Sequence, residues 1–257
     1  MEKGGSMKGI KAKVVVIPSD FRLLNYIQSK DCMCYIETGV TNENATIEMR
    51  FTTCDDSTTD CLWCSRTDLL ANSFTAFLIN GMIRYDIGDA HLNSLAYKDN
   101  TDYVIKADNG RMWIDGTKVI DVTPAVFTEY NYITLLDSRI GSGAPTLSGN
   151  NNANIKLKGC RIYKSNQLVR DFIPALNSNG VAGLLDTVNS KFYVSPNGMA
   201  FNYGLQKKTI ALHNVKLELS DHPTDYVDYQ GGVIRKALVT CCHLLAERRW
   251  QHERSEN

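Results

Sequence analysis

The sequence has no net charge and no long hydrophobic run. Lysine and arginine number 28, and aspartate and glutamate also number 28, so the formal charge is +0 at pH 7. This balance argues against a general nucleic-acid binder, because such proteins present a net basic surface to phosphates. No apolar stretch approaches the roughly 18 residues of a membrane-spanning helix. The run from Val14 to Ile17 is too short for a secretory signal, so we expect synthesis in a cytoplasm without a signal peptide.

Closely spaced acidic residues are also missing from the strand-like segments. Retaining glycoside hydrolases carry two carboxylates about 5 Å apart, which β-sandwich enzymes place at alternate positions of one strand. The segments IETGV, NENATIEMR and LELSD do not have that spacing. A Ser-His-Asp pattern and a phosphate-binding glycine loop are absent as well. We therefore expect no enzyme and no catalytic residue.

The cysteines allow a metal site or buried thiols. Cys61 and Cys64 have the spacing of a zinc ligand pair, which Cys32 and Cys34 could complete. In a strand, however, residues i and i+3 point to opposite faces. The sequence favours reduced, metal-free thiols that pack as small hydrophobic groups. The sequence likewise predicts that the remaining cysteines are reduced and that neither they nor two histidines bind a metal. These residues are Cys54, Cys160, Cys241, Cys242, His243 and His252.

Short apolar segments with a period of two dominate the chain from about residue 14 to 203, which indicates β-strands. Three pairs, Asn80-Gly81, Asn109-Gly110 and Asp115-Gly116, favour type I′ hairpin turns because their residues tolerate positive φ. Gly159 lies where the parity of the apolar residues changes, which predicts a β-bulge. These features predict an all-β fold, a two-sheet antiparallel jelly-roll sandwich.

We expect three parts in the chain: an N-terminal arm over 1–21, a jelly-roll domain over 22–204 and a C-terminal extension over 205–257. The extension contains one helix candidate, 233–249, with apolar residues on one face: Ile234, Leu238, Cys241 and Leu245. The arm and the helix either pack on the sandwich or attach it to a partner subunit. The Gly-, Ser- and Asn-rich segment 137–154 is either a mobile loop or a binding loop.

Five segments resemble successive parts of one family of modules. They are YIQSKDCMCYIETGV (26–40), CLWCSRT (61–67), RMWIDGTKV (111–119), IKLKGCRIYKSNQLVRDFIPA (155–175) and GVAGLLDTVNSKFYVSPNG (180–198). Together they resemble concanavalin A-like, laminin-G-like jelly-roll modules of bacteriophage virion proteins and gut-bacterial surface proteins. The resemblance covers about residues 22–204, and residues 205–257 have no counterpart in it. This sequence differs from the modules at Cys32, Cys34 and Cys64, where the modules have small or polar residues.

The resemblance implies a lectin-like fold and a non-catalytic role. We expect a virion structural or decoration protein, a capsid, fibre or tail component located in the virion. Its partners are other virion subunits, reached through the arm and the helix, and surface glycans. The alternatives are a glycoside hydrolase or a bacterial surface carbohydrate-binding module on the same fold. The resemblance leaves calcium possible, but no acidic cluster in the sequence indicates it, so no cofactor or metal is expected.

Two sets of residues are worth locating in the structure. Arg170 and Asp171 match a pair that the modules also have, and we expect them to hold their segment by hydrogen bonds, because one Arg and one Asp do not define a reaction class. Glycan sites on such folds use loop amides with an exposed aromatic ring. The candidates are Asn150–Asn152, Trp63 and Trp113, although strand aromatics are more often part of the core.

Overall fold

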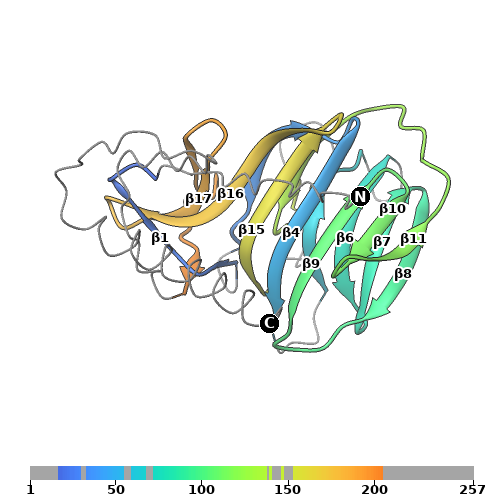
Figure 1. Ribbon diagram of the computed structural model, residues 1–257, viewed down its shortest axis with the longest axis horizontal. Coiled ribbons are helices and arrows are strands. Elements are labelled where there is room, and N and C mark those ends of the chain that lie inside the picture. The colour runs from blue at the N-terminus through green and yellow to red at the C-terminus, as the bar shows by residue number, and fades with distance from the viewer. Residues whose placement is uncertain are drawn as a thin grey trace, which may run out of the picture. The chain divides into compact units, whose positions relative to one another are not determined.

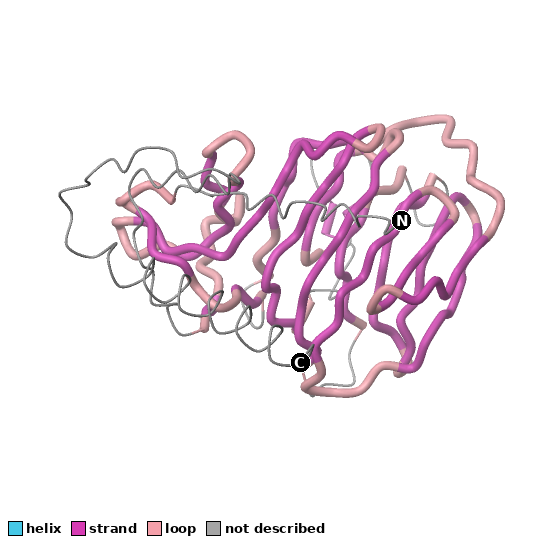
Figure 2. The backbone as a smooth tube through the Cα atoms, in the orientation of Figure 1, coloured by secondary structure: helices cyan, strands magenta, loops and turns pink. Residues whose placement is uncertain are grey.

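The computed structural model describes residues 17–29, 33–54, 59–67, 72–137, 139–140, 146–147 and 153–204. These residues belong to one compact unit, Ile17–Thr209. Figure 2 shows this part of the chain as strands and loops, without a helix. The predicted helix 233–249, the arm up to residue 16 and the amides Asn150–Asn152 lie outside the described residues.

The larger sheet has the order β11-β10-β9-β4-β15-β16-β17-β18, with β1, β2 and β19 attached beside this path. In Figure 1 it runs from β16 across β15, β4 and β9 to β10 and β11. Its strands are β1 (Phe21–Leu23), β2 (Ile27–Gln28), β4 (Ala45–Thr53), β9 (Asp102–Asp108), β10 (Arg111–Ile114), β11 (Thr117–Asp121), β15 (Ile155–Lys164), β16 (Gln167–Asn177), β17 (Ala182–Asp186), β18 (Lys191–Tyr193) and β19 (Asn202–Tyr203).

The smaller sheet has the order β3-β12-β5-β6-β7-β8. Its strands are β3 (Ile36–Thr41), β5 (Asp60–Cys64), β6 (Ser73–Ile79), β7 (Met82–Gly88), β8 (Ala90–Ala96) and β12 (Tyr132–Leu135). A separate ribbon pairs β13 (Arg139–Ile140) with β14 (Thr146–Leu147). All pairings in both sheets are antiparallel, so the predicted two-sheet antiparallel sandwich is confirmed.

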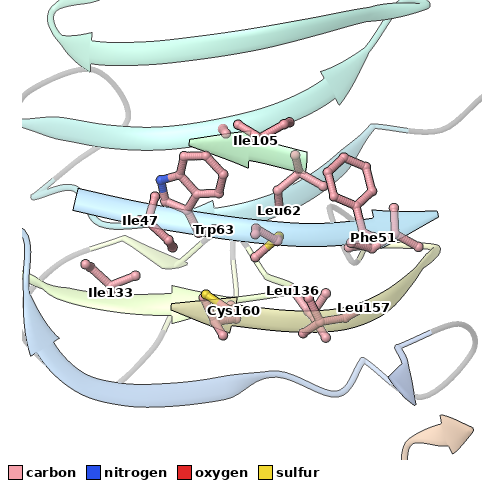
Figure 3. Packing of buried hydrophobic residues seen from close by; sticks show 14 of the residues in the cluster. Ile47, Phe51, Leu62, Trp63, Ile105, Ile133, Leu136, Leu157 and Cys160 are labelled. Carbon is pink, nitrogen blue, oxygen red and sulfur yellow. The ribbon is translucent and has the colours of Figure 1, made fainter. Parts of the chain in front are cut away.

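One hydrophobic core fills the space between the sheets. Strand β4 alternates buried Ile47, Met49 and Phe51 with more exposed neighbours, which is the period of a strand with one face inward. Figure 3 shows Ile47, Phe51, Ile105, Leu157 and Cys160 from the larger sheet packed with side chains of the smaller sheet. The core therefore uses the inner faces of both sheets and leaves the outer faces for other roles.

All three predicted pairs form hairpin turns, and two of the three have the φ angles of type I′. Both residues have positive φ at Asn80-Gly81 (51° and 73°) and at Asp115-Gly116 (49° and 81°), as type I′ turns require. At Asn109-Gly110 only the glycine does, with φ of 98°. The Asn109 side chain instead donates to the carbonyl oxygen of Ala125 at 2.7 Å and accepts its N–H at 2.8 Å, which ties this turn to the next loop.

Six strand pairs of the two sheets have register shifts, and three of these bear on side chains discussed below. The predicted bulge beside Gly159 is confirmed, because Leu157 pairs with Phe51 and Gly159 with Arg50. The second falls in β11, where Met112 pairs with Ile120 and Trp113 with Lys118. The third, in β5, falls at Leu62, between the residues that pair with Phe77 and Ala76. The last two were not predicted from the sequence.

Candidate functional site

The two tryptophan candidates have opposite environments. Trp63 is 0% exposed and packs 6.3 Å from the Phe74 ring inside the core, so it is unavailable to a ligand. Trp113 is half-buried on the outer face of the larger sheet. Its neighbours Met112 and Ile114 are buried in the core, and alternation along β10 therefore turns the indole outward. Of these two rings, only Trp113 can contact a ligand.

Trp113 belongs to a row of side chains that crosses the outer face of the larger sheet, one from each of six strands. In order from β16 to β11 the row is Asp171, Arg161, Glu48, Lys106, Trp113 and Lys118. Strands lie about 4.8 Å apart, so five steps span about 24 Å. We call this set the cross-strand row.

An open cleft lies over the middle of the cross-strand row. Its volume is about 410 Å³, and it is lined by Glu48, Val104, Lys106, Trp113 and Gly116. This volume falls within the range of small-molecule sites, about 300–1,000 Å³. The Asp115-Gly116 turn borders it, and Asp115 Oδ1 accepts the N–H of Val104 at 2.9 Å. Nothing lies within 4 Å of a Cβ built on Gly116, so the turn leaves the cleft open.

Charged side chains surround the indole of Trp113. The Lys106 Nζ atom and the Arg111 guanidinium carbon each lie 5.4 Å from the ring centroid, within the range of cation–π contacts. Arg111 also forms an ion pair with Asp108 at 2.7 Å, and this hydrogen bond raises the pKa of the guanidinium. The ring thus combines an apolar surface with cationic hydrogen-bond donors that lie over it.

The other half of the row is a connected set of ion pairs. Glu48 Oε1 lies 3.3 Å from Arg50 Nη2 and 3.6 Å from Arg161 Nη1. Arg161 Nε then contacts Asp171 Oδ1 at 3.1 Å. The cavity over these residues is only about 70 Å³, too small for a ligand by the range above. These residues act as the charged end of the larger cleft, with which they share Glu48.

Arg170 and Asp171 hold their segment by hydrogen bonds, as predicted from the sequence. Arg170 Nε donates to the carbonyl oxygen of Thr38 in β3 at 3.1 Å and lies 3.5 Å from Asp186 Oδ2. Asp186, which is 0% exposed, accepts the N–H of Asp171 at 3.0 Å. The pair therefore joins β16 to β17 and to the smaller sheet.

The cysteines require two corrections. Cys34 is disulfide-bonded, so the prediction of reduced cysteines is wrong there, whereas Cys54, Cys61, Cys64 and Cys160 carry thiols. The geometric argument that separated Cys61 from Cys64 is also wrong. The bulge at Leu62 turns both Leu62 and Trp63 inward, so Cys61 and Cys64 share the outer face and pack with Phe77. Nowhere in the described ranges do three His, Cys, Asp or Glu side chains meet as metal ligands.

Burial sets the protonation of these thiols. It raises the pKa of Cys61 well above the ordinary value, and a hydrogen bond and the charge of Cys64 raise it further. Burial also raises the pKa of Cys160, with added effects of Glu48 and Asp171. Both groups are protonated at neutral pH, which makes them poor nucleophiles. They contribute to packing rather than to a reactive site.

The comparisons with known proteins return a similarity of structure alone. No family model matches the chain, and no curated protein matches it. Among solved structures, a proposed carbohydrate-binding protein from Bacteroides ovatus ATCC 8483 superposes with a TM-score of 0.46 at 9% identity. The match covers 71% of this chain and 60% of that one. Within the described residues, no helix has the length and apolarity that a membrane crossing needs.

Proposed function

We propose that this chain is a non-catalytic module that binds carbohydrate on the outer face of its larger sheet. The observation that carries the proposal is the position of Trp113, an indole turned outward beside a 410 Å³ cleft. Sugar rings present apolar C–H faces and hydroxyl edges, and an aromatic ring with polar groups around it matches both. Glu48 and Lys106 supply an acceptor and a donor at the cleft for those hydroxyls.

The absence of catalysis is part of the proposal. Glu48 and Asp171 are the carboxylates of the cross-strand row, and Arg161 contacts both of them. Glycoside hydrolysis needs one carboxyl group that holds a proton at working pH. Here both carboxylates are engaged in ion pairs with the same guanidinium, which supports binding over hydrolysis. We expect no reducing-sugar release from polysaccharides that bind the protein.

The experiment is a glycan array followed by titration calorimetry with the glycans that bind. Trp113→Ala should weaken binding by about 2 kcal/mol or more, because buried Trp contacts dominate interfaces, which is about 30-fold in Kd. Tyr132→Ala is the matched control, since Tyr132 is 64% exposed on the smaller sheet. Equal binding by Trp113→Ala and the unmodified protein, or no binding to any glycan on the array, contradicts the proposal.

We also propose, more specifically, that the module is a virion component attached through residues 1–21 and 205–257. The support is the resemblance to modules of bacteriophage virion proteins described above. Deleting residues 1–19 and, separately, 233–257 should abolish incorporation into particles and leave the thermal transition intact. Normal incorporation of both truncated chains would contradict this finer proposal without affecting carbohydrate binding.

A further inference from the structure

Lys106 lines the cleft, and its ammonium group has no carboxylate within ion-pair distance among the described residues. Its ring contact is with Trp113. Five other cations on the outer face of the larger sheet each have an acidic partner. The pairs are Arg50 with Glu48, Arg161 with Asp171, Lys158 with Asp102, Arg111 with Asp108, and Lys118 with Asp121. Lys156 and Lys191 also have a ring contact and no ion pair within the described residues, but neither lines the cleft. The uncompensated charge in the cleft is therefore that of Lys106.

Glu48 is the acidic residue placed to pair with Lys106, but its carboxylate contacts other cations. Glu48 is directly opposite Lys106 in the β4–β9 register, where cross-strand side chains of opposite charge normally pair. Instead its Oε1 atom faces Arg50 and Arg161, at 3.3 and 3.6 Å. Two guanidinium groups therefore hold the Glu48 carboxylate away from Lys106. The lysine is left beside the indole with its charge available.

The Asp115 carboxylate, at the border of the cleft, also has a hydrogen-bond partner of its own. Asp115 Oδ1 accepts the backbone N–H of Val104 at 2.9 Å, which uses its charge within the turn. Of the cleft-lining residues, Glu48 and Lys106 carry charge, and the charge of Glu48 is balanced by two arginines. A ligand in this cleft therefore meets one uncompensated positive charge next to an apolar ring.

We infer that the carbohydrate is acidic, with a carboxylate or sulfate that pairs with Lys106 while the sugar ring contacts Trp113. This inference rests on the proposed carbohydrate-binding function and specifies its ligand class. A neutral sugar would leave the ammonium without a charge partner, whereas an acidic group forms a charge-assisted hydrogen bond of higher strength. The cation–π contact already places the ammonium beside the ring, so one sugar unit reaches both groups.

The test compares probes that differ in charge alone. Titration calorimetry measures binding of an oligogalacturonate and of its methyl ester, and of sialyllactose and of its methyl ester. We expect the acidic member of at least one pair to bind at least tenfold more tightly than its neutral counterpart. Affinity for that acidic member should also fall as salt increases, because the ion pair is screened.

Substitutions assign this preference to Lys106. Lys106→Gln should weaken binding of the acidic probe about tenfold or more, and Lys106→Arg should retain most of the affinity. Lys191→Gln is the matched control, because Lys191 also lies over a ring, 4.8 Å from the Tyr193 centroid, but on the distant strand β18. It should leave affinity unchanged.

The outcomes separate the two proposals. Trp113-dependent binding without a preference for acidic probes, or an acidic preference that survives Lys106→Gln, overturns the inference and leaves the carbohydrate-binding proposal standing. Equal losses in Lys106→Gln and Lys191→Gln indicate non-specific attraction and also overturn it. If no probe in either pair and no glycan on the array binds, both proposals fail together.

Discussion

The outer faces of the two sheets each carry an aromatic ring flanked by two cations. On the larger sheet, Lys106 and Arg111 lie 5.4 Å from the Trp113 centroid. On the smaller sheet, Arg66 and Arg84 lie 5.8 and 5.9 Å from the Phe77 centroid. Phe77 is only 5% exposed and packs with Cys61 and Cys64, whereas Trp113 lines an open cleft. The same local chemistry therefore stabilises packing on one face and remains available for a ligand on the other.

The largest effect expected from this difference is on stability at Phe77. Phe77→Ala should lower the free energy of unfolding by about 3–5 kcal/mol, because a buried ring leaves a cavity and loses its transfer free energy. Urea unfolding followed by tryptophan fluorescence measures this change. A loss below about 1 kcal/mol would mean that the Phe77 cluster is not a packed part of the fold.

The second effect concerns alkaline pH and the thiols beside Phe77. The folded-state pKa of Cys61 is raised, so the folded protein keeps this proton while the unfolded chain loses it above the ordinary value of 9.0. The stability contributed by the protonated thiol is present below pH 9 and declines as the pH rises toward the folded-state pKa. The slope per thiol approaches about 1.4 kcal/mol per pH unit.

Cys61→Ala removes this contribution. Urea unfolding at pH 7 and pH 10 should show a decline that is smaller in Cys61→Ala than in the unmodified protein by about 1 kcal/mol. Trp113→Ala, on the opposite outer face, should show the full decline. An identical pH dependence in Cys61→Ala and the unmodified protein would contradict the buried-thiol explanation.

A smaller effect is expected when the exposed ring is truncated. Trp113→Ala should lower the free energy of unfolding by about 1 kcal/mol or less, since the ring is partly in water and no closed cavity forms. The same urea titration used for Phe77→Ala gives the comparison directly. A loss comparable to that of Phe77→Ala would place Trp113 among the structural residues, and weaker binding could then no longer be attributed to a lost ligand contact.

The smallest effect belongs to the exposed pair of Lys158 and Asp102. Hydrogen bonds from Lys158 and Thr52 lower the pKa of Asp102, so the pair stabilises the fold above the ordinary carboxyl pKa and loses this effect as the pH falls through the lowered value. Because the Asp102 side chain is 69% exposed and solvent screens the pair, Asp102→Asn should cost about 0.5 kcal/mol or less at pH 7. The cost should vanish at pH 2, and a constant cost at both pH values would exclude the ion pair as its cause.

The sequence predicts the sandwich well because its signals are local. Alternation along β4 and the Asn80-Gly81 and Asp115-Gly116 turns depend on neighbouring residues, and each is found as predicted. The bulge at Leu62 is different, because the run DCLWCS is apolar on both faces and contains no glycine to mark it. That single inserted residue reversed the predicted relation between Cys61 and Cys64.

The site was only partly visible in the sequence. The segment RMWID contained the signal for Trp113, since Met112 and Ile114 alternate with Arg111 and Trp113, and this alternation could have separated it from Trp63. Glu48 and Lys106 could not be found in this way, because they are register partners on strands that are more than fifty residues apart in the chain. Register between distant strands depends on the whole sheet, and a single sequence does not reveal it.

The cross-strand row has a consequence for how this surface can diversify. Each strand contributes one outward residue to the row, and its two chain neighbours in β4 and β10 point into the core. An exchange at Glu48, Lys106 or Trp113 therefore alters one position along the face without changing the volume of the core. Substitutions can therefore change this surface one strand at a time, while the packing of the core beneath it stays the same.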